Sequence, residues 1–341
     1  MRLRHRVALG DFLPDLPPTP FPPLRIHLTG KTVLVVGVDG ELVHLDCQTL
    51  QPSSEVAKPF PSGIQHSVVA EGKFIGTWTE YDLQIARMAA LSLSEPFQEG
   101  VSRSELRLAL RRSGSEIGSE IDERNAGDVA GAEWSHVLEA EPLCLTSNGE
   151  RIAFCMYGRG IYCTSPDSEE FWRQPLVEWL DLNHLSDGPH IVCMTCGPDP
   201  ADPTIERIWL WSAGGGWAYY SWENGDLMAQ GTLGVEIVLE SAWSNGLGEW
   251  LLSSPPQMVA RWKPGGEAEI ATVQGPVNLA RWEDNGWSIA GWREDLRWDI
   301  HGLKSEPRRE IGVAFYDHPK RGTLVLDNIG RWSKFGGGKS G

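Results

Sequence analysis

A pattern of three short strands recurs along this chain about every 40 residues, and it limits the possible folds more than any other feature of the sequence. Each copy contains an apolar strand, a Gly-containing turn, a second strand, another turn and a third strand that often carries an aromatic side chain. Third strands are expected near residues 40–46, 160–164, 216–222, 258–262, 296–300 and 329–333. One such unit cannot bury its apolar face alone, so the copies must stack into one continuous core.

Stacked copies of such a unit predict an all-β fold, a seven-bladed β-propeller. Six copies provide four strands each and the seventh provides three, although six or eight blades are also compatible with the pattern. We expect residues 2–9 to supply the missing strand, since they alternate in strand fashion and would close the circle of blades. Residues 1–335 then form one predicted domain, and residues 336–341 form a disordered tail.

Two short segments resemble known repeats. Residues 39–49, Asp-Gly-Glu-Leu-Val-His-Leu-Asp-Cys-Gln-Thr, are similar to the PQQ-like repeat, and Trp298-Asp299 is a Trp-Asp pair in a third strand. No blade has the Gly-His pair that starts the WD40 motif. The whole chain therefore resembles seven-bladed propellers of the WD40 and PQQ-like type in architecture. The resemblance implies a fold and does not single out an activity.

Charge and composition disfavour several classes of partner. The chain carries 46 acidic and 30 basic residues, for a formal net charge of −16. Nucleic acids and anionic membranes both require a positive face, so neither is an expected partner. The N-terminus lacks a signal-peptide pattern, and no apolar run reaches the ~18 residues of a membrane span. The six cysteines lie mostly in apolar strand patterns, where a reduced thiol behaves as a small hydrophobe, so we expect a cytoplasmic protein.

Catalytic motifs are not recognisable, and we assign no catalytic residue and expect no cofactor. The question of activity stays open, with a non-catalytic role favoured. The enzyme alternative is a metal-dependent hydrolase or lyase centred on the propeller channel, with His27, His66 and His190 on the predicted inner strands of three blades as metal ligands. Histidines that make ordinary hydrogen bonds account for the same three residues.

Three connections are longer than the repeat requires, at residues 94–132, 165–175 and 197–206. In a four-stranded blade the loops after the first and third strands emerge on one face. All three insertions are therefore expected together over blades 2–4. Because recognition commonly resides in loops on a rigid scaffold, we predict a non-catalytic protein–protein interaction platform whose partner, a protein, contacts this face.

The longest insertion is predicted to contain a helix in blade 2. The run Ser102-Arg-Ser-Glu105 fits a capping box, and Leu106, Ala109 and Leu110 follow at helical spacing. The remaining surface carries four candidate partner-binding residues, Arg103, Arg107, Arg111 and Arg112. A helix that packs its apolar stripe on the propeller and leaves its arginines in solvent explains the same pattern equally well.

A third alternative is a nucleic-acid-associated binding module. It would use a basic strip formed by Arg2, Arg4, Arg6, Arg308, Arg309, Arg321 and Lys334. Charged outer strands also prevent edge-to-edge aggregation, which accounts for these residues without a ligand.

Overall fold

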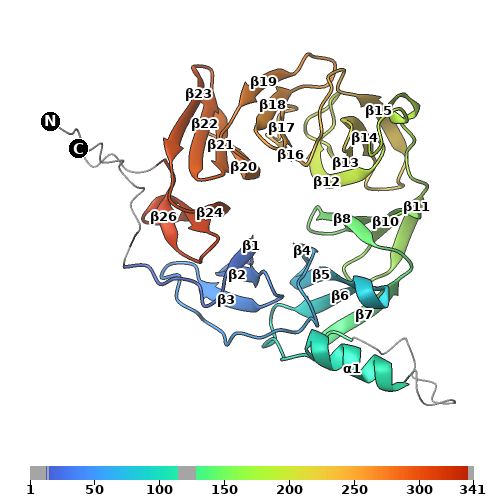
Figure 1. Cartoon of the computed structure of the whole chain (residues 1–341), viewed down its shortest axis with the longest axis vertical. Coiled ribbons are helices and arrows are strands. Elements are labelled where there is room, and N and C mark those ends of the chain that lie inside the picture. The colour runs from blue at the N-terminus through green and yellow to red at the C-terminus, as the bar shows by residue number, and fades with distance from the viewer. Residues whose placement is uncertain (1–12, 14, 114–127, 337–341) are drawn as a thin grey trace.

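Seven antiparallel sheets stand around a central axis in the computed structural model (Figure 1). The structure describes residues 13, 15–113 and 128–336. Within each sheet the strands pair in chain order, and the first strands of successive sheets contact one another around the axis. The predicted all-β, seven-bladed propeller is thereby confirmed.

The strands are distributed over the blades as follows. Blade 1 contains β1 (Pro23–Leu28), β2 (Thr32–Gly37) and β3 (Leu42–Asp46). Blade 2 contains β4 (His66–Ala70), β5 (Lys73–Glu80), β6 (Ile85–Ser92) and β7 (Ala132–Leu138). Blade 3 contains β8 (Pro142–Ser147), β9 (Ile152–Met156), β10 (Gly160–Thr164) and β11 (Glu170–Gln174). Blade 4 contains β12 (Ile191–Pro198), β13 (Glu206–Ser212), β14 (Gly216–Tyr220) and β15 (Leu227–Thr232).

The last three blades complete the circle. Blade 5 contains β16 (Ser241–Ser244), β17 (Trp250–Ser254), β18 (Met258–Trp262) and β19 (Glu269–Thr272). Blade 6 contains β20 (Val277–Glu283), β21 (Gly286–Gly291), β22 (Glu294–Asp299) and β23 (Gly302–Pro307). Blade 7 contains β24 (Gly312–His318), β25 (Gly322–Asp327) and β26 (Trp332–Lys334). Helical segments are η1 (Tyr81–Leu83), α1 (Arg103–Ser113) and η2 (Leu180–Leu182).

The core lies between neighbouring blades, where large aromatic side chains fill the space. The second strands are continuous apolar runs, as a strand covered on both faces requires, and every residue of β9, β17 and β21 is buried. Between blades 4 and 5 the rings of Trp209 and Trp250 lie 4.7 Å apart, with Trp211 beside them. These tryptophans therefore form the core between the blades, whereas Trp292 is exposed in a turn.

Blade 1 has no fourth strand among the described residues, although the repeat predicted four strands in each of the first six blades. Residues 52–59 take its place, and the isolated bridges there are Leu42↔Ala57 and Leu45↔Pro52. Prolines in and beside the segment cannot donate to a ladder. Its outward carbonyl groups are bound instead by the connection between β6 and β7, because Gly100 N–H donates to Lys58 O at 2.9 Å. A Cβ atom at Gly100 would lie 2.4 Å from Pro59 O, so this close approach requires glycine.

The N-terminal part of the described chain lies against the last blade. Leu13 N–H donates to Trp332 O at 3.2 Å, and Thr19 N–H donates to Gly330 O at 2.8 Å. The buried Leu16 side chain packs in the same apolar cluster as Trp332. The predicted closing strand at residues 2–9 and most of the predicted tail, residues 337–341, lie outside the described residues.

The two faces of the propeller differ in the connections they carry. On the hairpin face, as we name it, lie the turns after the first and third strand of each blade. On the opposite face, the crossover face, lie the turns after the second strand and the connections from one blade to the next. Bonds between turns support this division, since Glu71 N–H of blade 2 donates to Gly149 O of blade 3 at 3.2 Å on the hairpin face. No helix among the described residues is long and apolar enough to span a membrane.

Candidate functional site

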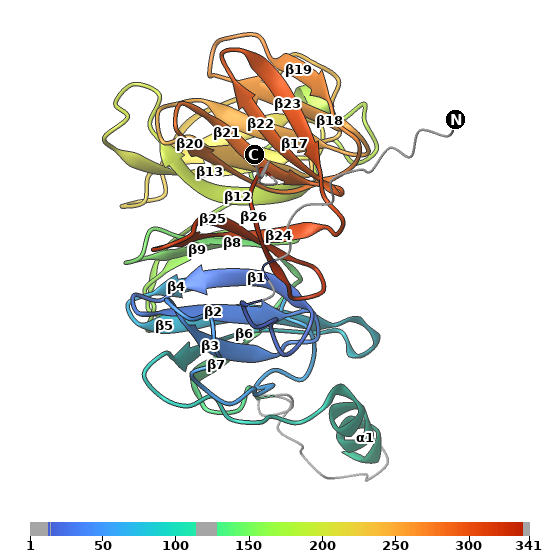
Figure 2. The same cartoon turned by 90° about the vertical axis from the view of Figure 1, so that its left-hand side faces the viewer.

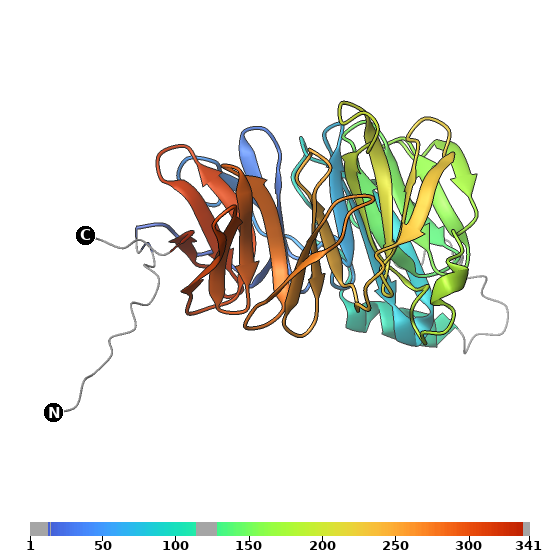
Figure 3. The same ribbon diagram turned by 90° about the horizontal axis from the view of Figure 1, so that it is seen from above.

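The connection between β6 and β7 crosses the propeller from one face to the other. It begins on the hairpin face, where Leu93 N–H donates to Gly72 O at 2.9 Å. It then passes blade 1 at Gly100 and reaches α1, which contacts the turn after β5 on the crossover face. Figure 2 labels α1 beyond the strands of blades 1 and 2, and Figure 3 shows the same helix, in teal, at the lower edge of the propeller. The expectation that all three long insertions share one face is therefore wrong for α1.

The two shorter insertions remain on the hairpin face. The loop between β10 and β11 packs against β7, because Trp134 Nε1–H donates to Pro166 O at 2.8 Å. Lys73 forms ion pairs with Glu133 and with Asp167, which joins blade 2 to this loop. The loop between β12 and β13 is stabilised within blade 4 by the Arg207 to Asp199 ion pair at 2.8 Å. Only these two insertions therefore follow the predicted arrangement.

Helix α1 begins with a reciprocal cap. Ser102 N–H donates to Glu105 Oε2 at 2.8 Å, and Glu105 N–H donates to Ser102 Oγ at 3.3 Å. The buried Leu106 side chain packs in a cluster with Phe60 and Trp78 of the first two blades. The predicted capping box and apolar stripe thus place α1 directly on the propeller.

Two of the four candidate arginines hold α1 in place. The carboxylate of Glu80, at the end of β5, is fully buried and accepts hydrogen bonds from both Arg103 and Arg107. The Arg103 Nη2 to Glu80 Oε1 distance is 2.9 Å, and the Arg107 Nη2 to Glu80 Oε1 distance is 2.6 Å. Arg107 also pairs with Asp82. Helix α1 packs on the propeller as the alternative expected, but Arg103 and Arg107 form ion pairs with Glu80 where that alternative left them in solvent.

The side chains of Arg111 and Arg112 lie outside the described part of the structure. Glu80 is a residue that the sequence analysis missed. Its signal was a single carboxylate at the end of the otherwise largely apolar run Lys-Phe-Ile-Gly-Thr-Trp-Thr-Glu.

Replacing Glu80 with glutamine should loosen α1. The hydrogen bond to Arg103 is the main cause that lowers the pKa of Glu80 to about 2, from an ordinary value of 4.5. Because the folded-state pKa is depressed, this stabilisation is present above pH 4.5 and is lost as the pH falls towards 2. We expect the variant to lose about 1–3 kcal/mol of its free energy of unfolding. Backbone amides of residues 102–108 should exchange their hydrogens faster. The free energy of unfolding should also depend less on pH between 4.5 and 2, because the Glu80 carboxylate that titrates there is gone.

Asp82→Asn is the matched control for this change. Its carboxylate also accepts a bond from Arg107 but is 69% exposed, so its loss should cost well under about 1 kcal/mol. Equal exchange rates in the two variants would contradict the anchoring role of Glu80.

The crossover face over blades 2–4 carries several exposed apolar side chains. Tyr81 in η1 is 59% exposed, Tyr157 in the turn after β9 is 61% exposed, and Leu180 in η2 is 72% exposed. Leu108 of α1 and Val101 just before it are also exposed. Exposed apolar groups of this kind, gathered on one face, mark interaction surfaces more often than isolated ones do.

Glu141 connects the two tyrosines on this face through its side chain and its backbone. Tyr81 Oη–H donates to Glu141 Oε1 at 2.5 Å, and Tyr157 N–H donates to Glu141 O at 2.9 Å. Nearby, Glu139 is 74% exposed and lies 3.8 Å from Arg159. Further exposed carboxylates come from Glu178, Asp181 and Asp187 in the connection to blade 4. Exposed apolar side chains and carboxylates therefore lie together on this face, beside the half-exposed Arg103 and Arg159.

The three histidines proposed as metal ligands do not form a metal site. Among the described residues, no group of three or more His, Cys, Asp or Glu side chains could hold a metal ion. His27 Nε2 instead bonds Ser67 Oγ at 2.8 Å, and exposed His190 lies with its ring 6.1 Å from that of Tyr157. Burial, with a smaller contribution from Arg25, lowers the pKa of both His27 and His66 to about 4, so both are neutral at neutral pH. The alternative of a histidine that makes an ordinary hydrogen bond therefore describes His27.

Three arginines of the proposed basic strip form internal ion pairs. Arg308 Nη2 lies 2.7 Å from Asp295, Arg309 lies 3.5 Å from Glu310, and Arg321 pairs with Asp15. Arg2, Arg4 and Arg6 lie outside the described residues. The described arginines of the strip thus neutralise the protein's own carboxylates.

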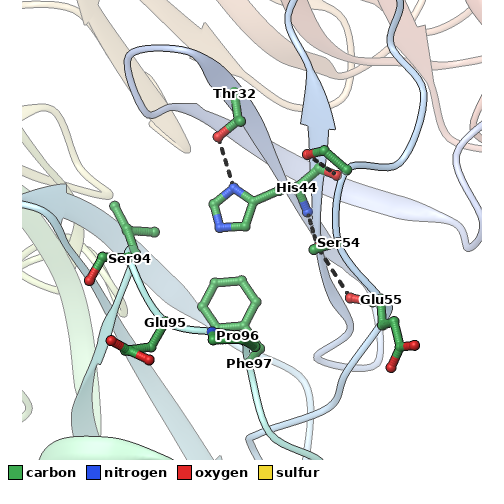
Figure 4. A pocket seen from close by; sticks show the side chains of 10 residues that line it. Thr32, His44, Ser54, Glu55, Ser94, Glu95, Pro96 and Phe97 are labelled. Carbon is green, nitrogen blue, oxygen red and sulfur yellow. Dashed lines mark hydrogen bonds between the residues drawn. The ribbon is translucent and has the colours of Figure 1, made fainter.

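A cavity of about 570 Å³ lies between blade 1 and the segment that follows β6. Figure 4 shows His44 of β3 above the ring of Phe97, with Glu55 and Glu95 on opposite sides. The two rings are stacked, with centroids 5.2 Å apart and an interplanar angle of 12°. His44 N–H donates to Ser54 Oγ at 2.9 Å. The sequence analysis missed this site, whose signal was a histidine within the apolar strand Leu-Val-His-Leu-Asp.

Two solved β-propeller structures are similar in fold to this chain. No protein-family model and no curated protein matches the chain. The β-propeller domain of Cps50 (Swd1) from Myceliophteria thermophila is similar in fold, with a TM-score of 0.58 and 9% identity over 95% of this chain and 98% of that chain. BamB from Moraxella catarrhalis gives a TM-score of 0.52 and 11% identity over 93% of this chain and 83% of that chain. The first is a WD40 propeller and the second a PQQ-like propeller, so the predicted architectural resemblance is confirmed.

Proposed function

We propose that this protein is a non-catalytic protein-interaction platform whose contact surface is the crossover face over blades 2–4. The observation that carries the proposal is the set of exposed apolar side chains on that face, with Tyr81, Tyr157 and Leu180 all more than half exposed. Apolar surface of this kind is unfavourable in water and becomes favourable when a partner covers it. A rigid propeller holds the backbone of these three residues in fixed positions, which lowers the entropy cost of binding.

The chemistry of the face indicates the kind of partner. Asp82 is 69% exposed and Glu139 is 74% exposed, and the whole chain carries a net charge of −16. A partner segment with apolar side chains and neighbouring Lys or Arg residues complements this surface, since opposite charges guide association and select the partner. In this proposal Arg103 and Arg107 position α1, whereas Arg111 and Arg112 remain candidate contacts.

A cytoplasmic location belongs to the same proposal. All six cysteines are free thiols. Cys193 Sγ–H points to Ala242 O of blade 5, and Cys196 Sγ–H points to Ser147 O of blade 3 at 3.1 Å. Burial raises the pKa of Cys193 to about 11 and that of Cys196 to about 12, so both thiols stay protonated and unreactive. Free thiols suit a reducing compartment.

The test compares two double variants in affinity capture from native lysate, followed by measurement of binding to the purified partner. Tyr157→Ser with Leu180→Ser removes two exposed apolar groups from the crossover face. Leu247→Ser with Ile300→Ser removes two groups that are 69% and 86% exposed on the hairpin face. All four side chains are exposed, so both variants should keep the fold.

We expect the crossover-face variant to bind the partner at least about tenfold more weakly, as the loss of two interface contacts implies. The hairpin-face variant should bind like the wild type. Loss of the partner from the hairpin-face variant alone would place the contact surface on the other face and contradict the proposal.

A further inference from the structure

We propose that the cavity beside His44 binds an organic ammonium group, supplied by a lysine side chain or by a free amine. This site lies on the outer side of blades 1 and 2, apart from the crossover face, so the inference does not depend on the proposed function. The cavity of about 570 Å³ is within the range of small-ligand sites.

A hydrogen-bond chain lies behind the ring of His44. Thr29 Oγ1 lies 3.1 Å from Thr32 O and 2.6 Å from Thr32 Oγ1, and Thr32 Oγ1 lies 2.9 Å from His44 Nδ1. As part of the proposal, Thr29 donates to Thr32 O and Thr32 donates to the Thr29 hydroxyl oxygen, so that Thr32 accepts from His44 Nδ1–H. This arrangement leaves a free lone pair on His44 Nε2.

The Nε2 atom of His44 is buried and has no hydrogen-bond partner among the described residues. Burial lowers the pKa of His44, which keeps the imidazole neutral at neutral pH. Stacking on Phe97 fixes the ring plane, so the lone pair has a fixed direction. A buried acceptor beside a cavity requires a donor to satisfy it.

The other polar groups of the cavity select a cationic donor over a neutral one. Glu55 and Glu95 contribute carboxylates, and Ser54 and Ser94 contribute hydroxyl groups (Figure 4). Lys and Arg are absent from the described residues that line the cavity. An ammonium group has three donors and no acceptor, so it can donate to the imidazole lone pair while the two carboxylates of the cavity lining attract its positive charge. Water could also satisfy Nε2, and this attraction favours an ammonium group over water.

The experiment follows the imidazole nitrogen resonances of His44 by NMR while a capped Gly-Lys-Gly peptide is added. Its isostere with norleucine in place of lysine is the matched ligand, and n-butylammonium represents a free amine. We expect the lysine peptide to shift the Nε2 resonance and to bind at least tenfold more tightly than the norleucine peptide. Tighter binding of the peptide than of butylammonium would assign the ammonium to a polypeptide, and the reverse order would assign it to a small amine.

Glu95→Gln tests the charge without touching the core, because Glu95 is exposed. This variant should bind the lysine peptide about threefold to tenfold more weakly than the wild type does. The matched control is Glu150→Gln, which removes one exposed carboxylate from a turn of blade 3 and should leave binding unchanged. Equal affinities of the lysine and norleucine peptides, or a His44 that carries its proton on Nε2, would overturn the proposal.

Discussion

Replacing Arg308 with methionine should lower the free energy of unfolding by about 3–5 kcal/mol. Arg308 and Asp295 are 7% and 5% exposed, and they form a bidentate pair with distances of 2.9 Å and 2.7 Å. Arg308 also donates to Ser333 Oγ of blade 7 at 2.5 Å, so the pair joins blades 6 and 7. The variant removes one charge and leaves the Asp295 carboxylate buried without its partner, which is the costly step.

Denaturant unfolding measures this change, with two comparisons. Arg309→Met alters the next residue, whose side chain is 68% exposed and 3.5 Å from Glu310, and should cost less than about 1 kcal/mol. The double variant Arg308→Met with Asp295→Leu removes both charges and should recover much of the lost stability. If Arg308→Met were no worse than Arg309→Met, the pair would not be a structural link between the blades.

Replacing Trp250 with alanine should also lower the free energy of unfolding by about 3–5 kcal/mol. This side chain is fully buried between blades 4 and 5, with Trp209 at 4.7 Å and Trp211 at 5.1 Å between ring centroids. Gly197 makes room for it, since a Cβ atom there would lie 2.5 Å from the indole ring. Alanine would leave a cavity that the surrounding strands, held by their ladders, cannot close.

Trp292→Ala is the natural comparison for Trp250→Ala. Trp292 is 45% exposed in the turn after β21. The Trp292→Ala variant should therefore lose less than about 1.5 kcal/mol of its free energy of unfolding. Thermal and denaturant unfolding should separate the two variants clearly. Similar losses would mean that the aromatic cluster between blades 4 and 5 contributes no more than surface packing does.

The propeller could be predicted from the sequence because each blade repeats a local pattern. Apolar second strands, glycine turns and aromatic third strands recur, and each local signal agrees with the same global fold. Blade 1 departed from the pattern where Pro52 and Pro59 interrupt its last strand. That departure depends on a distant segment, because the backbone around Gly100 occupies the edge of the blade.

The sites were harder to predict because their partners are far apart in the chain. The capping box of α1 is local and readable, but the face on which α1 lies depends on Glu80, whose link to Arg107 spans 27 residues. Likewise His44 becomes a candidate site only when Phe97 is placed against it. The spacing of arginines on a helix therefore shows that one face of the helix is positively charged. It does not show whether those arginines pair with carboxylates of the same protein or contact a partner.

The contact between the first described residues and blade 7 has a consequence for how the protein forms. Thr19 precedes all seven blades in the chain and Gly330 lies in the last of them, yet they bond at 2.8 Å. Most of the blades can fold one after another as they emerge, because each contacts mainly its neighbours. The seam between blades 7 and 1 must wait until all seven blades have been made and incurs the full entropy of closing that loop. Tension applied between residues 13 and 336 would load this seam first, so the propeller should open there before any other pair of blades separates.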